Sequence, residues 1–344
     1  PTVTAFDGNG AMYVAEMRTY MQDIKGSTTK EKSSRVSRHE DTNGDGVMDK
    51  HTVFVDNLVL PRVILPLDHR ILIGETFDTS IYSYEDTDGD GVADKKELWY
   101  KGKQNANNVE HSYSGLVWAM DNYIYMSKSS KRFRHQADGT AKEFKTSASG
   151  QFGLSQDNDG KPWFIWAGNE QGPVNYQHHI QYGSSYCTQT IIDDFRRVFP
   201  IDNIKDAEGG ERRHGKDGRL NHFTATCGIC VYRGDRLPEE IRGDIFFAEP
   251  VGRLVRRAQV IDKDGIKYLK NPYEVDKSEF IASTDANFRI VNVANGPSGG
   301  LYLTDMYRGI IQEANWVPEN GRLWKSIDKY GLDKNIGRGR IYRL

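Results

Sequence analysis

The chain has few cysteines, no long apolar run and almost no net charge, and each of these absences excludes a class of protein. Three cysteines among 344 residues are too few for a disulfide scaffold, and their odd number leaves at least one thiol unpaired. No apolar run approaches the roughly 18 residues that a membrane span needs. With 46 basic and 48 acidic residues, the formal charge of −2 gives no general attraction to nucleic acid or to a membrane surface.

The cysteines also lack the pattern of a redox, zinc or haem site. Cys227 and Cys230 form a C-x-x-C, but they lie in residues 225–232, which have the composition of a strand. Residues three apart on a strand face opposite sides, so the two sulfurs would diverge. No histidine follows as in C-x-x-C-H, which excludes a covalent haem of that type. A bridge between Cys187 and Cys227 stays open.

What the sequence does contain is a nine-residue acidic pattern that occurs twice, at residues 41–49 and 86–94. It offers carboxylate or amide oxygens at positions 1, 3, 5 and 9, a backbone carbonyl at position 7 and a glycine at position 6 for the sharp turn, as calcium loops do. The predicted ligands are Asp41, Asn43, Asp45, Val47 and Asp49 in the first loop, and Asp86, Asp88, Asp90, Val92, Asp94 and Glu97 in the second.

The two loops differ in the residue at position 12 of this pattern. Glu97 stands there in the second loop and could close the calcium shell with both carboxylate oxygens, whereas the first loop has Thr52. We therefore expect the second site to bind more tightly. A metal-free acidic turn is the alternative, although its carboxylates would then repel one another. The flanking residues are β-branched and aromatic, which predicts that each loop is the tip of a β-hairpin and that calcium has a structural role.

Short repeats predict the overall architecture. A turn followed by an apolar strand recurs six times, aligned on Val14, Ile73, Met126, Ile165, Phe247 and Leu303. The spacing is close to the roughly 40 to 50 residues of a four-stranded propeller blade with loop insertions. The sequence therefore predicts an all-β, six-bladed β-propeller as a single domain over residues 1–344. A long insertion is expected at about residues 175–221, and its basic cluster, Arg212 to His214, is interpreted as a solvated loop.

The first residue is a proline without a preceding methionine or signal pattern, from which we expect the chain to be a segment of a longer protein. Loops of this kind fill at the millimolar calcium found outside cells. We accordingly expect a periplasmic or extracellular location.

Several segments resemble the glucose/sorbosone dehydrogenase family, most clearly residues 227–249, 254–257, 288–305 and 339–344. The likeness is greater still to the propeller domain of a bacterial group designated membrane-bound dehydrogenases, often fused to helical-repeat and cytochrome c domains. The resemblance implies a six-bladed propeller that uses pyrroloquinoline quinone (PQQ) and calcium. It also implies oxidation of a sugar or aldose, with electrons passed to a cytochrome.

The resemblance assigns roles to His111 and Arg289, and the chain offers other residues where it departs from the family. His111 matches the histidine that takes the substrate hydroxyl proton, with Glu110 beside it to stabilise the imidazolium. Arg289 matches one of two arginines beside the quinone, but Val291 stands in the position of the second. The segment 149–155 has no arginine where the family carries one, and Gln151 is the residue there expected to reach the axis. Arg62 and Arg308 are candidates to supply the missing positive charge.

Two other functions remain open at this point. One is a non-catalytic, carbohydrate-binding or scaffold propeller in a cell-envelope complex, which the missing arginines favour. The other is a calcium-dependent, lactonase-like hydrolase with an axial ion ringed by Glu16, Glu75 and Asp305. Polar residues that follow the repeat strands could line a shared funnel in any of these cases: Glu16, Arg18, Glu75, Lys128, Asn169, Glu249 and Asp305. The expected ligand is a sugar or another polyhydroxylated small molecule.

Overall fold

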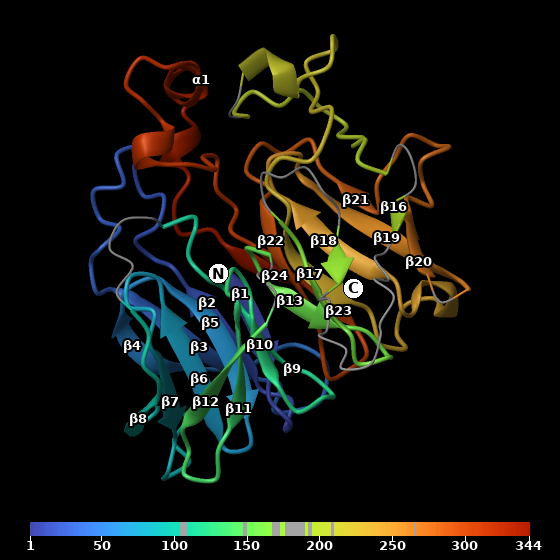
Figure 1. The fold of residues 1–344 in the computed structure, drawn as a ribbon. Coiled ribbons are helices and arrows are strands. Elements are labelled where there is room, and N and C mark those ends of the chain that lie inside the picture. The colour runs from blue at the N-terminus through green and yellow to red at the C-terminus, as the bar shows by residue number, and fades with distance from the viewer. Residues whose placement is uncertain are drawn as a thin grey trace.

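The structure is a computed structural model. It describes residues 1–103, 109–146, 150–166, 173–175, 190–191, 195–207, 210–264 and 266–344. Within these ranges nearly all regular structure is strand, and the strands fall into six sheets (Figure 1). Helical structure amounts to α1 (Arg322–Tyr330) and the short turns η1 (Gly210–Arg213), η2 (Glu239–Ile241), η3 (Ala314–Trp316) and η4 (Leu332–Lys334). Among the described residues, no helix has the length and apolar character needed to cross a membrane.

Three sheets are meanders of four antiparallel strands that follow one another in the chain. The first contains β1 (Val3–Phe6), β2 (Met12–Glu16), β3 (Ser34–Glu40) and β4 (Lys50–Leu58). The second contains β5 (Pro61–Leu67), β6 (Arg70–Glu75), β7 (Ile81–Glu85) and β8 (Lys95–Tyr100). The third contains β9 (Leu116–Trp118), β10 (Ile124–Met126), β11 (Lys131–His135) and β12 (Ala141–Lys145).

The other three sheets are less regular. The fourth has β13 (Leu154–Gln156), β14 (Pro162–Phe164) and β15 (Val174–Asn175), and the sixth has β22 (Ile290–Asn295), β23 (Leu301–Asp305) and β24 (Arg340–Arg343). The fifth runs through β17 (Cys227–Val231), β18 (Ile245–Glu249), β19 (Leu254–Lys263) and β20 (Ile266–Lys270). To it are added β16 (Thr190–Ile191), parallel to β20, and β21 (Ile281–Ala282), beside β19.

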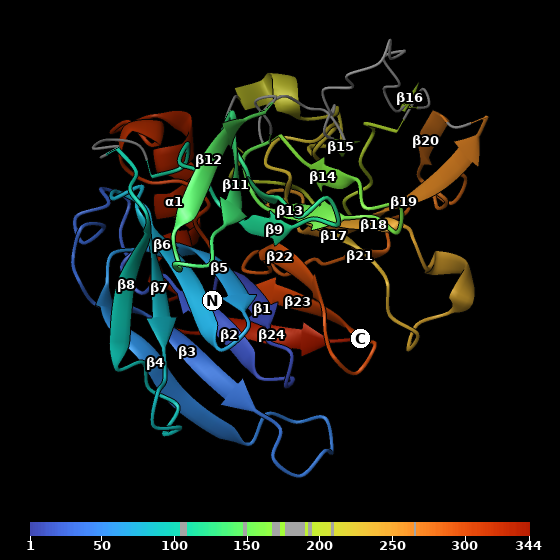
Figure 2. The same cartoon turned by 60° about the horizontal axis from the view of Figure 1, so that its bottom comes forward.

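The first strands of the sheets form a closed ring, which is the defining feature of a propeller. Each is in contact with the next in the order β1, β5, β9, β13, β17, β22, and β22 returns to β1. Figure 2 shows these strands gathered near the middle of the molecule. The second strands pack between neighbouring sheets, and for that reason β10, β18 and β23 are buried along their whole length. The predicted all-β propeller is confirmed.

Six complete four-stranded blades, however, are not what the structure contains. Four sheets have four sequential antiparallel strands, whereas the fourth and sixth have three strands among the described residues. The repeat positions were better predicted: Val14, Ile73, Met126, Phe247 and Leu303 lie on the second strand of their sheets, and Ile165 follows β14 directly. These side chains are buried between neighbouring sheets. Because both faces of such a strand are covered, its residues are apolar throughout and do not alternate with polar ones.

The described part of the predicted insertion contains buried apolar residues, whereas Arg212 of its basic cluster is exposed. Phe195, Val198, Ile204 and Leu220 are buried with side chains of β17, β18 and β19 in one apolar cluster. Cys187 lies outside the described residues, and Cys227 and Cys230 are buried free thiols on β17. The insertion therefore contributes to the core of the fifth sheet.

A buried ion-pair cluster fixes this insertion to the propeller. The Asp206 carboxylate accepts a hydrogen bond from Arg253 at 2.8 Å and another from Arg289, and all three side chains are at most 2% exposed. Arg289 also donates to the backbone carbonyls of Pro250, Gly309 and Arg308. Charges buried this deeply are tolerated only because they are paired and hydrogen-bonded.

We expect Asp206→Ala to lower the free energy of unfolding by about 3–5 kcal/mol, because it leaves two arginines buried without their partner. The matched control is Asp217→Ala, which removes an exposed carboxylate 3.9 Å from Arg219 and should change stability by less than about 1 kcal/mol. Urea unfolding of both variants measures the difference. Equal losses would contradict a structural role for the cluster.

Candidate functional site

A cavity of about 630 Å³ lies inside the ring of first strands. All six of these strands contribute to its wall, through residues such as Thr4 on β1, Arg62 on β5 and Asn292 on β22. Aromatic side chains, among them Phe152 and Trp316, complete the lining. The volume suits a small polar molecule rather than a polymer. Because the strands that line it belong to every sheet, this cavity is the place where distant parts of the sequence meet.

The structure brings together three of the predicted site residues on this wall. His111 precedes β9, Gln151 precedes β13, and Arg62 lies on β5, so the three come from consecutive sheets. The Gln151 Nε2 atom is 2.9 Å from Nδ1 of His111 and donates to the Glu110 carbonyl at 3.0 Å. The His111 ring lies 5.6 Å from that of Trp316, nearly edge to face. Gln151 thus orients the imidazole.

Arg62 is the most deeply buried cation of the cavity wall and is only 5% exposed. Its Nη1 atom donates to the Val109 carbonyl at 2.7 Å, and its guanidinium lies 5.7 Å from the centre of the Phe152 ring. Its Nε atom is buried and has no hydrogen-bond partner among the residues that the structure describes. A buried donor without a partner is costly, so this atom is suited to an acceptor on a bound molecule.

The environment of His111 keeps its imidazole neutral. Burial lowers its pKa, and the positive charges of Lys128 and Arg62 lower it further. The Gln151 amide also favours the neutral ring, because an imidazolium would carry its own N–H at the Nδ1 atom that this amide approaches. Glu110, which was expected to stabilise the imidazolium, lines the same cavity, and the net shift of the His111 pKa is downward. A neutral imidazole can accept a proton at once, although a lowered pKa makes it a weaker base.

Two further arginines, which the sequence analysis did not assign to the site, also line the cavity. Arg213 belongs to η1 in the insertion, and Arg233 follows β17. The basic cluster at residues 212–214 could have indicated Arg213 as a cavity residue. Its position, however, depends on how the insertion packs against the propeller, which the sequence does not give. With Arg62, these residues give the wall three positive charges, against the one carboxylate of Glu110.

Arg289 and Arg308 lie elsewhere. The Arg289 guanidinium is fully buried and bonded to Asp206 and backbone carbonyls, as described above. Burial lowers its pKa to about 10, so it stays charged within this cluster. Arg308 donates to the carbonyl of Asn335 in the η4 region. Neither belongs to the cavity wall, so, contrary to the prediction, neither is placed to hold a cofactor or substrate there.

The predicted ring of axial carboxylates does not form either. Glu75 accepts a hydrogen bond from the Val59 backbone, Asp305 from the backbones of Arg289 and Tyr307, and Glu249 from those of Thr224 and Ala225. Glu16 pairs with Arg35 on the first sheet. None of these four lines the cavity. Asn169 falls outside the described residues. Carboxylates at strand ends serve here to satisfy neighbouring backbone donors, so a lactonase-like activity would need an ion site other than this ring.

The two acidic loops are tips of β-hairpins, as predicted. The first joins β3 to β4 and the second joins β7 to β8. They share one hydrogen-bond network, in which the carboxylate at position 1 accepts from the backbone of positions 4 and 6, at 2.8 and 2.7 Å in the first loop and 2.7 and 2.8 Å in the second. Gly46 and Gly91 have φ of 88° and 92°, which favours glycine.

Acidic oxygens converge most closely in the second loop. One ligand atom each from Asp86, Asp88 and Asp94 lies within 4.8 Å of the others. Glu97, predicted as a further ligand, is 57% exposed on β8 and pairs with Lys95 at 3.3 Å. Its position in the strand, opposite Ser83, directs it into the ladder of side chains along the sheet. Its predicted role as ligand is thus not supported.

One family covers the whole chain: residues 1–344 match the family described as a domain of unknown function, DUF7133. The chain belongs to the DUF7133 family. No curated protein matches.

Three solved structures of similar fold are distant in sequence from this chain. One is a glucose dehydrogenase-type oxidoreductase of Thermus thermophilus, with a TM-score of 0.53 and 14% identity over 89% of this chain and 90% of that one. Another is a Trichoderma reesei enzyme of carbohydrate-active family AA12, with a TM-score of 0.51 and 12% identity over 89% and 90%. A luciferin-regenerating enzyme gives 0.51 and 12% over 99% and 90%. At these identities the likeness establishes the fold alone.

We expect the pKa of His111 to lie below the ordinary histidine value and to rise in Gln151→Leu, because that change removes an amide N–H that donates to Nδ1 and so favours the neutral imidazole. Gln136→Leu is the matched control, since the one hydrogen bond described for its side chain goes to the Arg134 carbonyl, away from the cavity. NMR titration of the histidine ring protons follows both variants. A pKa of His111 that falls in Gln151→Leu would contradict the assigned geometry.

The second acidic loop gives a separate prediction. Asp88→Asn keeps the acceptor for the Asp90 backbone but removes one negative charge, so it should reduce the rise in melting temperature caused by calcium and leave the value in chelator unchanged. Asp56→Asn is the control, because Asp56 likewise accepts from a neighbouring backbone but lies on β4. Differential scanning calorimetry with and without calcium measures the effect. An equal change in chelator would show that the loop acts without metal.

Proposed function

We propose that this propeller is an oxidoreductase that binds a sugar or another polyhydroxylated substrate in its axial cavity. We further propose that it is a quinone-dependent dehydrogenase of the glucose/sorbosone type. The observation that carries the proposal is the pairing, on one wall of the cavity, of a neutral imidazole with a buried arginine that has an unpartnered donor.

The residues of the cavity are compatible with pyrroloquinoline quinone. This cofactor carries three carboxylates, and Arg62, Arg213 and Arg233 supply three positive charges in the wall. The buried Nε of Arg62 has no partner in the described part of the chain, and a carboxylate oxygen would satisfy it. Phe152 and Trp316 provide flat apolar surface for a planar ring system. When bound, the quinone supplies a two-electron acceptor for a hydride.

The side chains of the protein have separable tasks in this proposal. His111 accepts the proton of the substrate hydroxyl, for which its neutral form is required. Gln151 is a positioning residue that holds the imidazole through Nδ1. Arg62 attracts and orients negative groups with a charge that survives burial. Aromatic rings and the closed ring of strands restrict water, which strengthens these charge interactions.

Calcium, location and partner extend the proposal. We propose that calcium occupies both hairpin loops, supported by their shared donor pattern and by the convergent oxygens of the second loop. A periplasmic or extracellular location fits such loops, and a cytochrome c or an envelope complex is the proposed electron-accepting partner. A binding or scaffold role without catalysis is the outcome that the following experiment would favour if turnover fails.

Purified protein should reduce an electron-accepting dye in the presence of PQQ, calcium and an aldose. Arg62→Met should abolish retention of the quinone after desalting, whereas His111→Asn should retain the quinone and lose at least about 100-fold in kcat. Arg70→Met is the control for Arg62→Met. Arg70 begins β6, pairs with Asp68 and does not line the cavity. Quinone retention by Arg62→Met equal to that of the unmodified protein would refute the cofactor site, and full turnover by His111→Asn would refute the base.

A further inference from the structure

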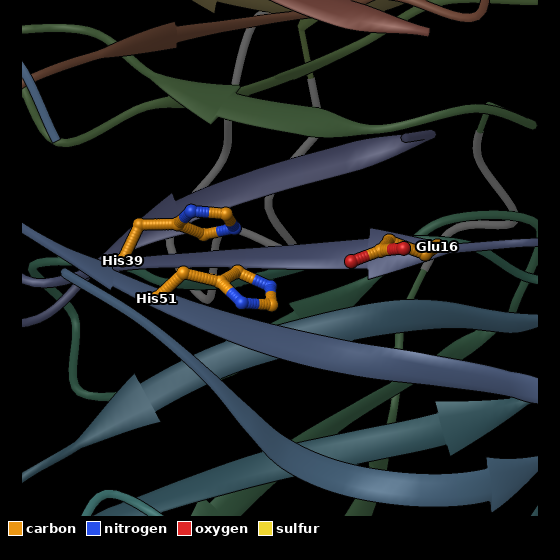
Figure 3. A group of neighbouring side chains, drawn as sticks. All are labelled: Glu16, His39 and His51. Atoms are coloured by element: carbon orange, nitrogen blue, oxygen red, sulfur yellow. The ribbon is translucent and has the colours of Figure 1, made fainter. Parts of the chain in front are cut away.

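A second group of metal-binding side chains lies on the first sheet, away from the axial cavity. Glu16 is at the end of β2, His39 is near the end of β3 and His51 is near the start of β4. One ligand atom from each lies within 4.8 Å of the other two. Figure 3 shows both imidazole rings directed toward the Glu16 carboxylate. Two nitrogen donors and one oxygen donor are therefore gathered by three adjacent strands.

The register of the sheet explains this convergence. His39 and His51 are directly opposite each other across the β3–β4 hairpin, so their side chains emerge on the same face. Their ring centres are 4.8 Å apart, tilted by 57°. Glu16 is opposite Arg35, on the same face of the neighbouring strand pair. Its side chain extends along the sheet to reach the two rings (Figure 3).

The chemical state of these groups suits a cation. Burial and the neighbouring His51 lower the pKa of His39 to about 4, so its ring is neutral near pH 7 and has a lone pair to donate. The pKa of Glu16 is also lowered, since hydrogen bonds from Ser37 and Arg35 outweigh burial, which keeps the carboxylate ionised. The Ser37 hydroxyl lies 2.9 Å from Nε2 of His39 and holds the ring in place.

We propose that Glu16, His39 and His51 form a binding site for a zinc-class divalent ion. Two imidazoles and one carboxylate prefer zinc to calcium, which favours oxygen-only shells. Ligand atoms in a tetrahedral zinc site are about 3.3 Å apart. The ligand atoms of Glu16, His39 and His51, now within 4.8 Å of one another, would reach this distance by small side-chain rotations, which the exposed His51 can make. Three protein ligands leave a coordination position for water.

Arg35 is the group that competes with the ion. Its Nε atom donates to Oε2 of Glu16 at 3.0 Å and neutralises the carboxylate when no metal is present. A bound dication would be repelled by this guanidinium, so removal of Arg35 should tighten metal binding. Loss of Arg35 should thus raise the metal affinity, whereas loss of a ligand should lower it, and the two opposite effects together distinguish this site. The ion would also join β2, β3 and β4 at the base of the first acidic loop.

Zinc is titrated into the protein in a buffer that contains a large excess of calcium. Calcium fills the carboxylate loops but competes poorly for imidazole. Isothermal calorimetry should give one zinc per chain, with affinity reduced at least about tenfold in His51→Ala and in His39→Ala. Arg35→Gln should increase the affinity. His69→Ala is the matched control, since His69 also contacts two carboxylates, at 3.3 and 3.2 Å, on the second sheet.

Cobalt in place of zinc provides a second readout, because tetrahedral cobalt with nitrogen ligands absorbs visible light strongly and this band should vanish in His51→Ala. His51 is exposed, so this variant is expected to fold, and its melting temperature in chelator checks that it does. Zinc binding that is unchanged in His51→Ala and His39→Ala would overturn the proposal. So would zinc binding that is weakened equally in His69→Ala, or an absence of zinc binding by the unmodified chain.

Discussion

Small twisted sheets cannot bury both of their faces alone, and this constraint shapes the whole molecule. The apolar second strands must be covered on both sides, so each sheet packs between two neighbours. Repeated around the axis, this packing brings β1, β5, β9, β13, β17 and β22 into a closed ring. The ring has an interior that the side chains do not fill, and every sheet contributes to its wall. The candidate site is thus a consequence of how the core is covered.

Buried arginines have two different roles in this arrangement. Arg289 is surrounded by acceptors from the protein itself, with Asp206 as its counter-ion, and it ties the insertion to the fifth and sixth sheets. Arg62 keeps a buried donor without such a partner and faces the cavity. The first arrangement is complete within the protein, whereas the second leaves a donor that the proposed ligand would satisfy. This difference supports the choice of Arg62 over Arg289 as the residue that meets a negative group.

Features that depend on near neighbours in the chain could be predicted from sequence, and those that depend on distant packing could not. The acidic loops were placed correctly at hairpin tips because their turn glycines and flanking strands lie within a few residues of each other. Arg289 was misassigned because its partner Asp206 lies in an insertion without repeat signal. Arg213 was missed for the same reason, and Glu16, His39 and His51 meet only once the strand register is known.

The account depends on the axial cavity being a site for an anionic, ring-shaped ligand held between Arg62 and His111. A crystal structure of the protein soaked with pyrroloquinoline quinone and calcium tests this most directly. The account predicts planar density inside the ring of first strands, with a carboxylate at hydrogen-bond distance from Arg62 Nε. A cavity that holds only water at saturating quinone, or quinone density at another surface, would contradict it.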